Sequence, residues 1–338
     1  VELLSDNEEQ QFIFLTGAAG TGKTTLLERV KNQLSSKKIV VAPTGIAALN
    51  IGGTTINSAF RIGFETVPVI TKSKDPRFAK LLKNLELLII DEVSMVRAPM
   101  LDAISQSLQI YKKSTEPFGG IHVLACGDLF QLPPVVKQHE EREIYDRYDS
   151  IYFFDALSFK EIKNVKYFQL DKSFRQEEDE GFYELLNNIR IGNDLEKTIN
   201  KINSQCFDPT LESDAYMTLT SRKNRAEELN NHKLTYLDSP EEIIKSKEFG
   251  ELNENDLPAP RELKIKQGAS VMFIKNDSEG RWVNGTLGTV AECLDKKKKC
   301  IKVKINNKTH KVEREEWNKV KFTYDDDSDE VLEEVVSS

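Results

Sequence analysis

The stretch GAAGTGKT, Gly17 to Thr24, matches the phosphate-binding pattern G-x-x-x-x-G-K-[ST] without a break. It follows the apolar run Phe12–Leu15 and precedes a segment, Thr25–Leu34, with apolar residues at helical spacing. This order of strand, glycine-rich loop and helix predicts an α/β domain in which the loop opens onto a helix N-terminus. Unpaired N–H groups and the helix dipole favour anions there, and glycines let the backbone approach a triphosphate closely.

The same pattern predicts which groups contact a nucleotide. We expect Lys23 to reach the β and γ phosphates of ATP and the Thr24 hydroxyl to hold Mg²⁺. The predicted nucleotide-binding set in this loop is Gly17, Ala18, Ala19, Gly20, Thr21, Gly22, Lys23, Thr24 and Thr25.

Two adjacent carboxylates follow a second apolar run. Asp91 and Glu92 come directly after Leu87–Ile90, so a buried strand delivers them at its carboxyl end, where open parallel sheets bind ligands. Asp91 is expected to bind Mg²⁺, usually through water, and Glu92 to orient and deprotonate the attacking water. Because nucleotide kinases need no such base, the pair favours hydrolysis of ATP over transfer of its phosphate.

Length and composition indicate a large protein without a membrane anchor. At 338 residues the chain is expected to form two or three domains. No apolar stretch approaches the roughly 20 residues of a membrane span. The four cysteines have no C-x-x-C spacing, so a zinc site is not expected, and Cys126 is predicted to be a core residue.

Charge is unevenly distributed along the chain. The net charge is −8, yet residues Lys296–Lys311 hold eight lysines and no carboxylate. Such a basic stripe either grips a phosphate backbone in a salt-dependent way or is simply a solvated hairpin, and the sequence leaves both interpretations open.

The first ~165 residues alternate strand and helix signals, which predicts a parallel sheet. The expected strands are Phe12–Thr16, Ile39–Ala42, Leu87–Asp91, His122–Gly127 and Tyr167–Leu170, with helices after the first four. Between them, Arg61–Arg77 has no helical period and is predicted to be an insertion.

The second half of the chain changes character. Tyr216–Thr220 and Asn224–Leu234 are predicted to be a strand and a helix that begin a second α/β domain. Short alternating strands separated by Asn-containing turns then indicate a small β-barrel. Its expected strands are Ala269–Ile274, Gly288–Cys293, Cys300–Ile305 and Lys319–Tyr324.

A third motif, Gly127-Asp128-Leu-Phe-Gln131-Leu-Pro-Pro134, also follows an apolar run, and here the chain resembles a known group. G-D-x-x-Q with following prolines is the γ-phosphate-sensing motif of superfamily 1 helicases. Further segments make the chain similar to the RecD-like petite-integration-frequency (PIF) helicases of group B. These are Ala42–Ala48, Gly53–Phe60, Asp91–Met95 and Lys172-Ser-Phe-Arg175-Gln, in family order.

The resemblance implies an ATP- and Mg²⁺-dependent DNA helicase built on RecA-like motor domains. It implies 5′ to 3′ movement on single-stranded DNA and unwinding of duplexes, forks and G-quadruplexes, in repair, recombination or telomere maintenance. Gln131 is then expected to sense the γ-phosphate and Arg175 to act as an arginine finger. The adenine-reading glutamine of the family has no convincing counterpart, although Gln11 lies near the right distance from the loop.

The resemblance also implies a domain plan and a DNA path. The plan is motor domain 1A at 1–60 and 78–170, wedge 1B at 61–77, partial motor domain 2A at 171–260, SH3-like domain 2B at 261–326, and an acidic tail or return to 2A at 327–338. Short polar groups and backbone amides on loops are expected to hold phosphates. The expected DNA-contacting residues are Pro43, Thr44, Gly45, Thr55, Asn57, Ser58, Phe60, Lys275 and Asn284. Phe60 either stacks on a base or belongs to the core.

Two departures from the family pattern define the alternatives. Asn57 stands where the family has histidine, and the sequence stops before the family's last motifs. The chain is therefore either a helicase seen without its last segment or an ATP-responsive module that binds single-stranded DNA. A third interpretation is an ATPase that acts on protein partners. We expect a monomer inside the cell, cytoplasmic in a bacterium and nuclear or mitochondrial in a eukaryote.

Overall fold

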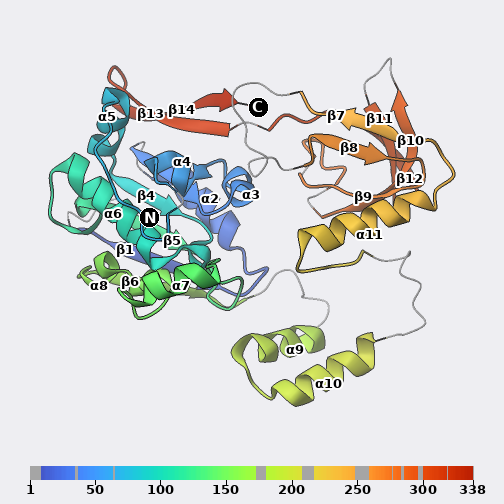
Figure 1. Cartoon of the computed structure of the whole chain (residues 1–338), viewed down its shortest axis with the longest axis horizontal. Helices are drawn as coiled ribbons and strands as arrows, with labels where there is room; N and C mark the ends of the chain where they lie inside the picture. Colours follow the sequence, from blue (N-terminus) through green and yellow to red (C-terminus); the bar gives the residue numbers. More distant parts are fainter. Residues whose placement is uncertain are drawn as a thin grey trace. The chain divides into compact units, whose positions relative to one another are not determined.

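The computed structural model describes residues 9–34, 37–63, 65–172, 180–207, 217–247, 259–275, 277–282, 285–295, 300–317 and 319–337. The chain divides into two compact units, Val1–Cys206 with Asn318–Ser337, and Phe207–Trp317 (Figure 1). In the part of the chain that is described, no helix has both the length and the apolar character needed to cross a membrane.

A six-stranded parallel sheet organises the first unit, in the order β3-β2-β4-β5-β1-β6. The strands are β1 Phe12–Gly17, β2 Lys38–Ala42, β3 Thr54–Thr55, β4 Leu87–Ile90, β5 His122–Cys126 and β6 Val165–Leu170. Every expected strand of this domain is present within a residue or two, and the RecA-like α/β prediction is confirmed.

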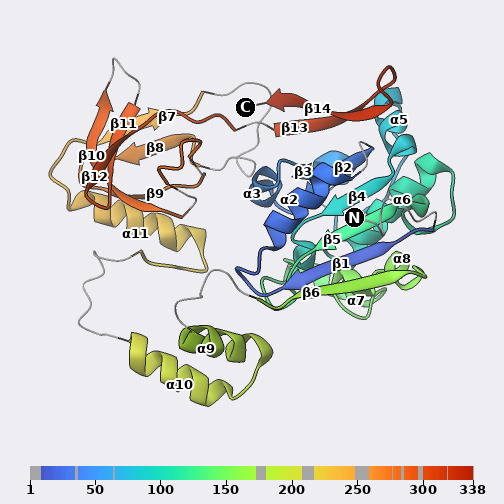
Figure 2. The same cartoon turned by 180° about the vertical axis from the view of Figure 1, so that it is seen from behind.

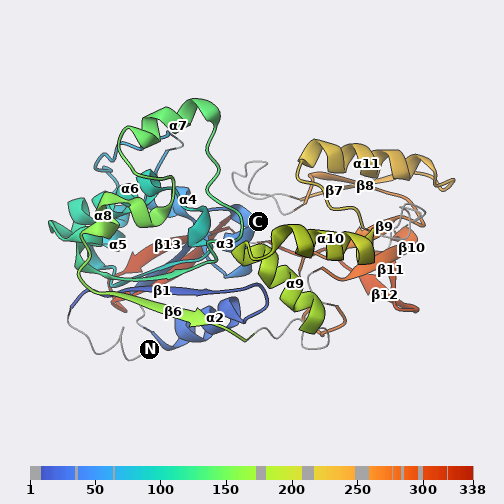
Figure 3. The ribbon, with the colours of Figure 1, turned by 90° about the horizontal axis from the view of Figure 1, so that it is seen from below.

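The first unit also contains helices. They are α2 Lys23–Gln33, α3 Gly45–Asn50, α4 Ile56–Phe60, α5 Pro76–Asn84, α6 Ala98–Lys112, α7 Gln138–Tyr145, α8 Leu157–Lys160, α9 Glu180–Ile191 and α10 Leu195–Cys206. Short 3₁₀ helices occur at η1 Val93–Met95, η2 Pro117–Gly120 and η3 Phe153–Asp155. Figure 3 shows α2 on one side of the sheet and α6 and α8 on the other.

The core follows from the alternation of side chains along the strands. In β1, Phe12 and Phe14 join one buried cluster while Ile13 and Leu15 join another on the opposite face. Successive strand residues point to opposite faces, so a strand covered on both sides must be apolar at every position. Cys126 is fully buried in the second cluster, as predicted.

The insertion expected at Arg61–Arg77 is a loop over most of its length. Its described residues up to Asp75 form neither helix nor strand, and α5 begins at Pro76 with the Asp75 side chain as its N-terminal cap. Arg61 pairs with Asp75 at 2.6 Å, so the two ends of the loop are held together.

The strand predicted at Lys319–Tyr324 exists but does not belong to the small barrel. It is β13, Lys319–Asp325, which pairs only with β14, Glu330–Ser337, among the described strands. The hairpin lies beside α5 in the first unit, as Figures 1 and 2 both show. The physical reason is that Phe322 is buried in the first unit's core and Asp329 pairs with Lys37 at 2.6 Å.

The second unit contains α11, Lys223–Thr235, and two antiparallel sheets. Strands β7 Glu242–Lys245 and β8 Glu262–Ile265 form one sheet. The other has the order β12-β11-β10-β9, with β9 Ser270–Met272, β10 Leu287–Asp295, β11 Cys300–Ile305 and β12 Lys308–Val312. The expected strand at Tyr216–Thr220 is not formed in its described part, 217–220, where every residue is exposed. The domain boundaries inferred from the family resemblance stay a prediction.

Candidate nucleotide site

The phosphate-binding loop joins β1 to α2. Gly22 precedes the helix with a left-handed backbone, φ 85° and ψ 18°, which glycine adopts without steric cost. Among the described residues no side chain caps this helix. The first-turn N–H groups therefore stay available for an anion, which is the arrangement expected of a phosphate site.

Two contacts keep the loop compact. A Cβ on Gly17 would lie 2.7 Å from both the Leu170 carbonyl oxygen and the Thr21 hydroxyl, so only glycine fits between β1 and β6. The Lys23 ammonium donates to the carbonyl oxygens of Gly17 at 2.8 Å and Ala18 at 3.0 Å. The lysine charge thus lies over the loop, on the side where α2 begins.

Asp91 and Glu92 follow β4 at the same edge of the sheet. The Asp91 N–H donates to the Val41 carbonyl at 2.9 Å, which extends the sheet by one residue, and Asp91 is 7% exposed. Glu92 has a left-handed backbone, φ 50° and ψ 41°, and turns the chain into η1. A non-glycine residue in this region costs of order 1 kcal/mol, and such strain is concentrated at functional sites.

The electrostatics of this edge favour a cation. Burial raises the pKa of Asp91, against the opposing effects of the Glu92 N–H, the Cys126 thiol and Lys23. Burial also raises the pKa of Glu92, and Asp91 and Asp128 raise it further while Lys23 lowers it. These charges are therefore close enough to act on one another, and carboxylates outnumber the lysine.

A magnesium ion fits this donor set. Asp91 follows β4 and Thr24 lies in the first turn of α2 after β1, so both are at the carboxyl edge of the sheet, and Thr24 is exposed. In the described part of the chain no cluster of three or more His, Cys, Asp or Glu is arranged to hold a metal. Mg²⁺ characteristically uses one or two protein ligands together with substrate phosphates and water, so a sparse set is the expected one.

The third motif lies at the end of β5, beside β4. Gly127 packs closely against the chain after Glu92, because a Cβ there would lie 3.0 Å from the Ser94 nitrogen. Asp128 is 1% exposed and accepts hydrogen bonds from the Phe130 N–H at 3.1 Å and the Gln131 side-chain amide at 3.1 Å. Gln131 is itself exposed, so its amide is held at the surface of the site.

The loops expected to contact DNA begin two short helices. Thr44 accepts from the Ala47 N–H as the cap of α3, and Thr55 accepts from the Ser58 N–H as the cap of α4. These loops follow β2 and β3, at the same edge of the sheet as the phosphate loop. Pro43 and Gly45 beside Thr44 are half-buried, while Ser58 is exposed.

Asn57 and Phe60, the other two expected DNA contacts in α4, face inward. The Asn57 amide donates to the carbonyls of Ile62 and Gly63, both at 3.0 Å, and so supports the start of the insertion. Phe60 is 3% exposed within the larger core cluster. Of the two roles open for Phe60, the structure supports the core role, and the DNA contact stays a prediction.

Gln11 lies at the wrong end of the sheet for an adenine contact. It precedes the first residue of β1, and its N–H donates to the His122 ring at 3.1 Å. Since a parallel strand rises about 3.3 Å per residue, Gln11 is about 20 Å from the phosphate loop at the other end of β1. Its side chain is buried, with one oxygen that has no hydrogen-bond partner among the described residues.

The remaining predicted residues lie elsewhere. Lys275 in the second unit pairs with Glu315 at 2.8 Å and sits 5.3 Å from the Trp317 ring centre. Arg175 and Asn284 lie outside the described residues.

A protein-family model described as PIF1-like helicase matches residues 3–200, more than half of the chain. The chain belongs to the PIF1-like helicase family. The resemblance drawn from the motifs is therefore confirmed.

Individual relatives agree with the family assignment. ATP-dependent DNA helicase PIF1 of Candida albicans is 33% identical over 84% of this chain and 33% of its own length. ATP-dependent DNA helicase Pif1 of Bdellovibrio bacteriovorus is 32% identical over 86% of this chain and 65% of its own. The chain thus spans about a third of the fungal relative.

Solved PIF1-like helicases have the same fold. Bacteroides sp Pif1 in complex with ADP-AlF4 is 35% identical, with a TM-score of 0.86 over 99% of this chain and 77% of that chain. Bacteroides Pif1 bound to single-stranded DNA is 36% identical, with a TM-score of 0.63 over 98% and 76%.

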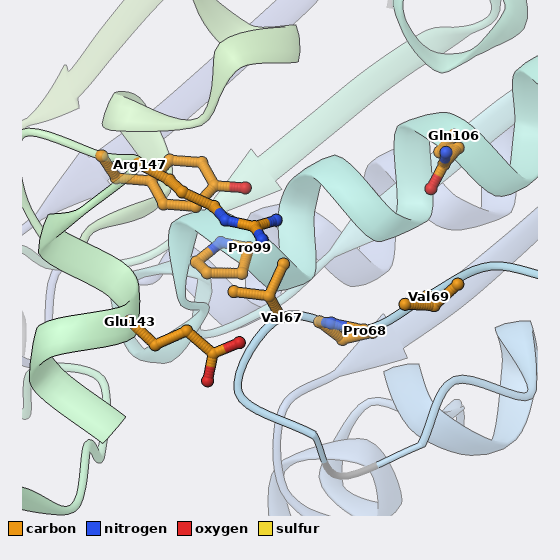
Figure 4. Close-up of a pocket in the computed structure, with 8 residues that line it drawn as sticks. Val67, Pro68, Val69, Pro99, Gln106, Glu143 and Arg147 are labelled. Atoms are coloured by element: carbon orange, nitrogen blue, oxygen red, sulfur yellow. The ribbon is translucent and has the colours of Figure 1, made fainter. Parts of the chain in front are cut away.

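A separate cavity of about 380 Å³ lies outside the nucleotide site. It is lined by Val67, Pro68, Val69, Pro99, Gln106, Glu143, Arg147 and Tyr148. Figure 4 shows the Arg147 side chain beside Pro99 and Val67. None of these residues belongs to the phosphate loop, to the Asp91–Glu92 pair or to the Gly127–Gln131 motif, so the cavity is not the nucleotide pocket. It lies between the insertion and the helices α6 and α7.

One contact of the site was not predicted. Arg190 of α9 donates to Asp128 at 3.0 Å, and its guanidinium lies 4.6 Å from the Phe130 ring centre. Sequence reasoning missed it because a single arginine on an amphipathic helix gives no local signal of what it contacts.

Proposed function

We propose that this chain is the motor part of an ATP-dependent DNA helicase that moves 5′ to 3′ on single-stranded DNA. The observation that carries the proposal is the meeting of three motifs at one sheet edge. The phosphate loop follows β1, the Asp91–Glu92 pair follows β4, and the Gln131 loop follows β5. Ligands of open parallel sheets bind at this edge.

The chemistry assigns one role to each group. Lys23 and the first-turn N–H groups of α2 bind the phosphates, and Glu92 accepts a proton from the attacking water. The raised pKa of Glu92 makes its carboxylate a stronger base than a solvated one. Thr24 and Asp91 would hold Mg²⁺, which supplies positive charge to the phosphate oxygens when bound. Gln131 takes the role of sensing the γ-phosphate, and its exposed side chain on the loop after β5 supports this role.

The DNA side of the proposal rests on the loops after β2 and β3. Thr44, Gly45, Thr55 and Ser58 present hydroxyl and backbone groups at the same edge, which suit phosphate contacts. The structure of Bacteroides Pif1 bound to single-stranded DNA, and a second one that concerns unwinding at forked double-stranded DNA by two coordinating Pif1 helicases, support both substrates. We also propose that the protein unwinds G-quadruplexes, with 61–77 as a wedge and the sheet β9–β12 as an SH3-like clamp.

The wider context follows from the same family. The protein acts as a monomer inside the cell, in repair, recombination or telomere maintenance, and relatives from both bacteria and eukaryotes support the intracellular location. A second candidate is an ATP-responsive module that binds single-stranded DNA without stepping. It is favoured by the contacts of Lys23 and Gln131, whose side chains both donate hydrogen bonds within their own loops.

The test is steady-state ATP hydrolysis by this chain with and without single-stranded DNA. Glu92→Gln serves as the blank, and Glu28→Gln, an exposed change on α2, is the matched control. Strong DNA stimulation lost only in Glu92→Gln supports the motor. DNA binding without stimulation supports the module, and absence of both favours an ATPase that acts on protein partners.

Direction needs a second measurement. Displacement of streptavidin from biotin at the 3′ end, but not at the 5′ end, of a single strand is the result expected for 5′ to 3′ movement. The opposite preference would refute the direction.

A further inference from the structure

Arg190 is a half-buried cation outside the three motifs, and it contacts the most buried carboxylate of the site. Its side chain is 20% exposed and that of Asp128 is 2% exposed, with 3.0 Å between the guanidinium nitrogen and the carboxylate oxygen. The same guanidinium lies over the Phe130 ring at 4.6 Å. Arg190 thus contacts two residues of the loop Gly127–Gln131, which we call the sensor loop.

The Asp128 carboxylate accepts three hydrogen bonds at the sensor loop. One of its oxygens accepts from Arg190 and from the Phe130 N–H, and the other accepts from the Gln131 amide. The carboxylate that orients Gln131 is therefore the one that Arg190 neutralises. A buried carboxylate that loses its cation must rearrange, become solvated or take up a proton.

Arg190 belongs to a helical hairpin and not to the sensor loop that it contacts. Arg190 lies in the last turn of α9, which ends before Gly192 and leads into α10. The two helices lie side by side in Figures 1, 2 and 3. The only described side-chain ion pair between this helical hairpin and the sensor loop is Arg190–Asp128.

We propose that Arg190 is a positioning residue that couples the helical hairpin α9–α10 to Gln131 through Asp128. When the sensor loop changes at ATP hydrolysis, Asp128 moves with Gln131, and the pair with Arg190 transmits the change to α9. The coupling rests on the proposed motor function. Arg190 itself touches neither the nucleotide-binding loop nor the Asp91–Glu92 pair in any described contact.

The guanidinium has the geometry that this role requires. Its flat face lies on Phe130 while one edge donates to Asp128, which a lysine ammonium cannot do at the same time. The Arg190 Nε is buried and has no hydrogen-bond partner among the described residues. Arg190 therefore contacts Asp128 through a single nitrogen donor, and this contact can break while the other hydrogen bonds of Asp128 remain.

Three variants test the proposal in the full chain. Arg190→Gln removes the charge and keeps a polar side chain, and Arg190→Lys keeps the charge without the flat fork. Lys201→Gln is the control, because Lys201 is an exposed cation on the neighbouring helix α10. Thermal melting of each variant first establishes that it is folded.

The first readout is independent of activity. Amide hydrogen exchange of the sensor loop should rise about tenfold in Arg190→Gln, because the Phe130 N–H loses a fixed acceptor. The exchange rate in Arg190→Lys should lie between those of Arg190→Gln and the unchanged chain, and the rate in Lys201→Gln should match that of the unchanged chain. Unchanged exchange in Arg190→Gln would overturn the proposal whether or not the chain is a helicase.

The second readout separates positioning from nucleotide binding. In Arg190→Gln, kcat in the presence of single-stranded DNA should fall about tenfold or more, as misplacement of a remote positioning group can do. The affinity for a fluorescent ATP analogue should change less than about twofold, since no Arg190 contact reaches the loop that binds it. A parallel loss of nucleotide affinity would assign Arg190 to the binding site and refute a positioning role.

A double variant completes the test. If Arg190 acts through Asp128, Arg190→Gln combined with Asp128→Asn should reduce DNA-stimulated turnover no further than the worse single variant. Additive losses would overturn the coupling. If the unchanged chain shows no DNA stimulation at all, the proposed motor function fails while hydrogen exchange still decides the Arg190 contact.

Discussion

The two main sheets of this molecule differ in how firmly they fix their loops. The parallel sheet of the first unit is covered on both faces, and its central strands β1, β4 and β5 are buried almost throughout. The antiparallel sheet of the second unit alternates between buried and exposed positions, as in β11. Its core cluster has three buried members, Trp282, Val303 and Ile305.

The difference explains where precise chemistry resides. In the first unit, neighbouring parallel strands end at one edge and bring charged groups together over a closely packed base. In the second unit the predicted DNA contact Lys275 is half-exposed, and its ammonium contacts the neighbouring residues Glu315, Glu316 and Trp317 near the surface. We infer that side chains positioned by a sheet covered on both faces are fixed more firmly than side chains on a sheet covered on one face.

Lys23→Ala should give the largest effect, because it removes the cation from the edge where carboxylates predominate. We expect ATP turnover to fall by about 100-fold or more, as removal of a preorganised charge-stabilising donor does. Steady-state hydrolysis with single-stranded DNA measures it. Arg29→Ala, an exposed change on the same helix, should leave turnover unchanged, and an equal loss there would contradict the assignment.

Trp282→Ala should destabilise the second unit and leave the first unit unchanged. Trp282 is 9% exposed and stacks on Phe273 at 4.4 Å, so its truncation should destabilise the second unit by about 3 kcal/mol. Both tryptophans of the chain lie in this unit, and Trp317 remains as the fluorescent reporter of its denaturant unfolding.

The first unit should not respond to Trp282→Ala. Affinity for a fluorescent ATP analogue is expected to match that of Tyr236→Ala, a change of an exposed aromatic in the second unit. If Trp282→Ala lowers both the nucleotide affinity and the denaturant midpoint reported by Trp317 fluorescence, the two units fold as one.

Arg190→Gln should show a pH-dependent loss of stability. In the unchanged chain burial raises the pKa of Asp128, but hydrogen bonds from Arg190, the Phe130 N–H and Gln131 lower it below its ordinary value overall. The charged form is thus favoured by folding, and this stability is lost only as pH falls through the lowered pKa. Arg190→Gln removes the largest of these lowering contacts, so the pKa of Asp128 should rise from its value in the unchanged chain.

The stability lost in Arg190→Gln should therefore depend on pH. Charged Asp128 costs stability at pH 7, by about 2 kcal/mol relative to the unchanged chain, and protonation relieves the cost as pH falls. Urea unfolding at pH 7, 6, 5 and 4 should therefore show a shrinking difference. A difference independent of pH would show that the loss comes from packing on Phe130 alone.

Lys275→Ala should have the smallest effect on folding. Its ion pair with Glu315 is at the surface, so we expect less than about 1 kcal/mol of lost stability. If Lys275 contacts a DNA phosphate, the slope of log affinity against log salt should fall by about one. Lys247→Ala, an exposed lysine in the same unit, is the control, and equal slopes in both variants would exclude a specific contact.

Much of the nucleotide site could be predicted because its information is local. The Gly17–Thr24 loop, the Asp91–Glu92 pair and the Gln131 motif each follow an apolar run, and parallel strands bring such ends together. The same logic failed for Gln11, because distance along the sequence does not say which end of a strand a residue occupies. It also left Phe60 undecided, since an aromatic residue in a short helix suits both a core and a base.

The sequence by itself determined the class of fold and the chemistry at the carboxyl ends of β1, β4 and β5, because strand period, glycine spacing and adjacent carboxylates are properties of short segments. Only the tertiary structure decided that Phe322 carries the β13–β14 hairpin into the first unit. Only it brought Arg190 to Asp128, 62 residues away in sequence. The physical reason is that burial and ion pairing between distant segments depend on which surfaces remain uncovered once the sheet has formed.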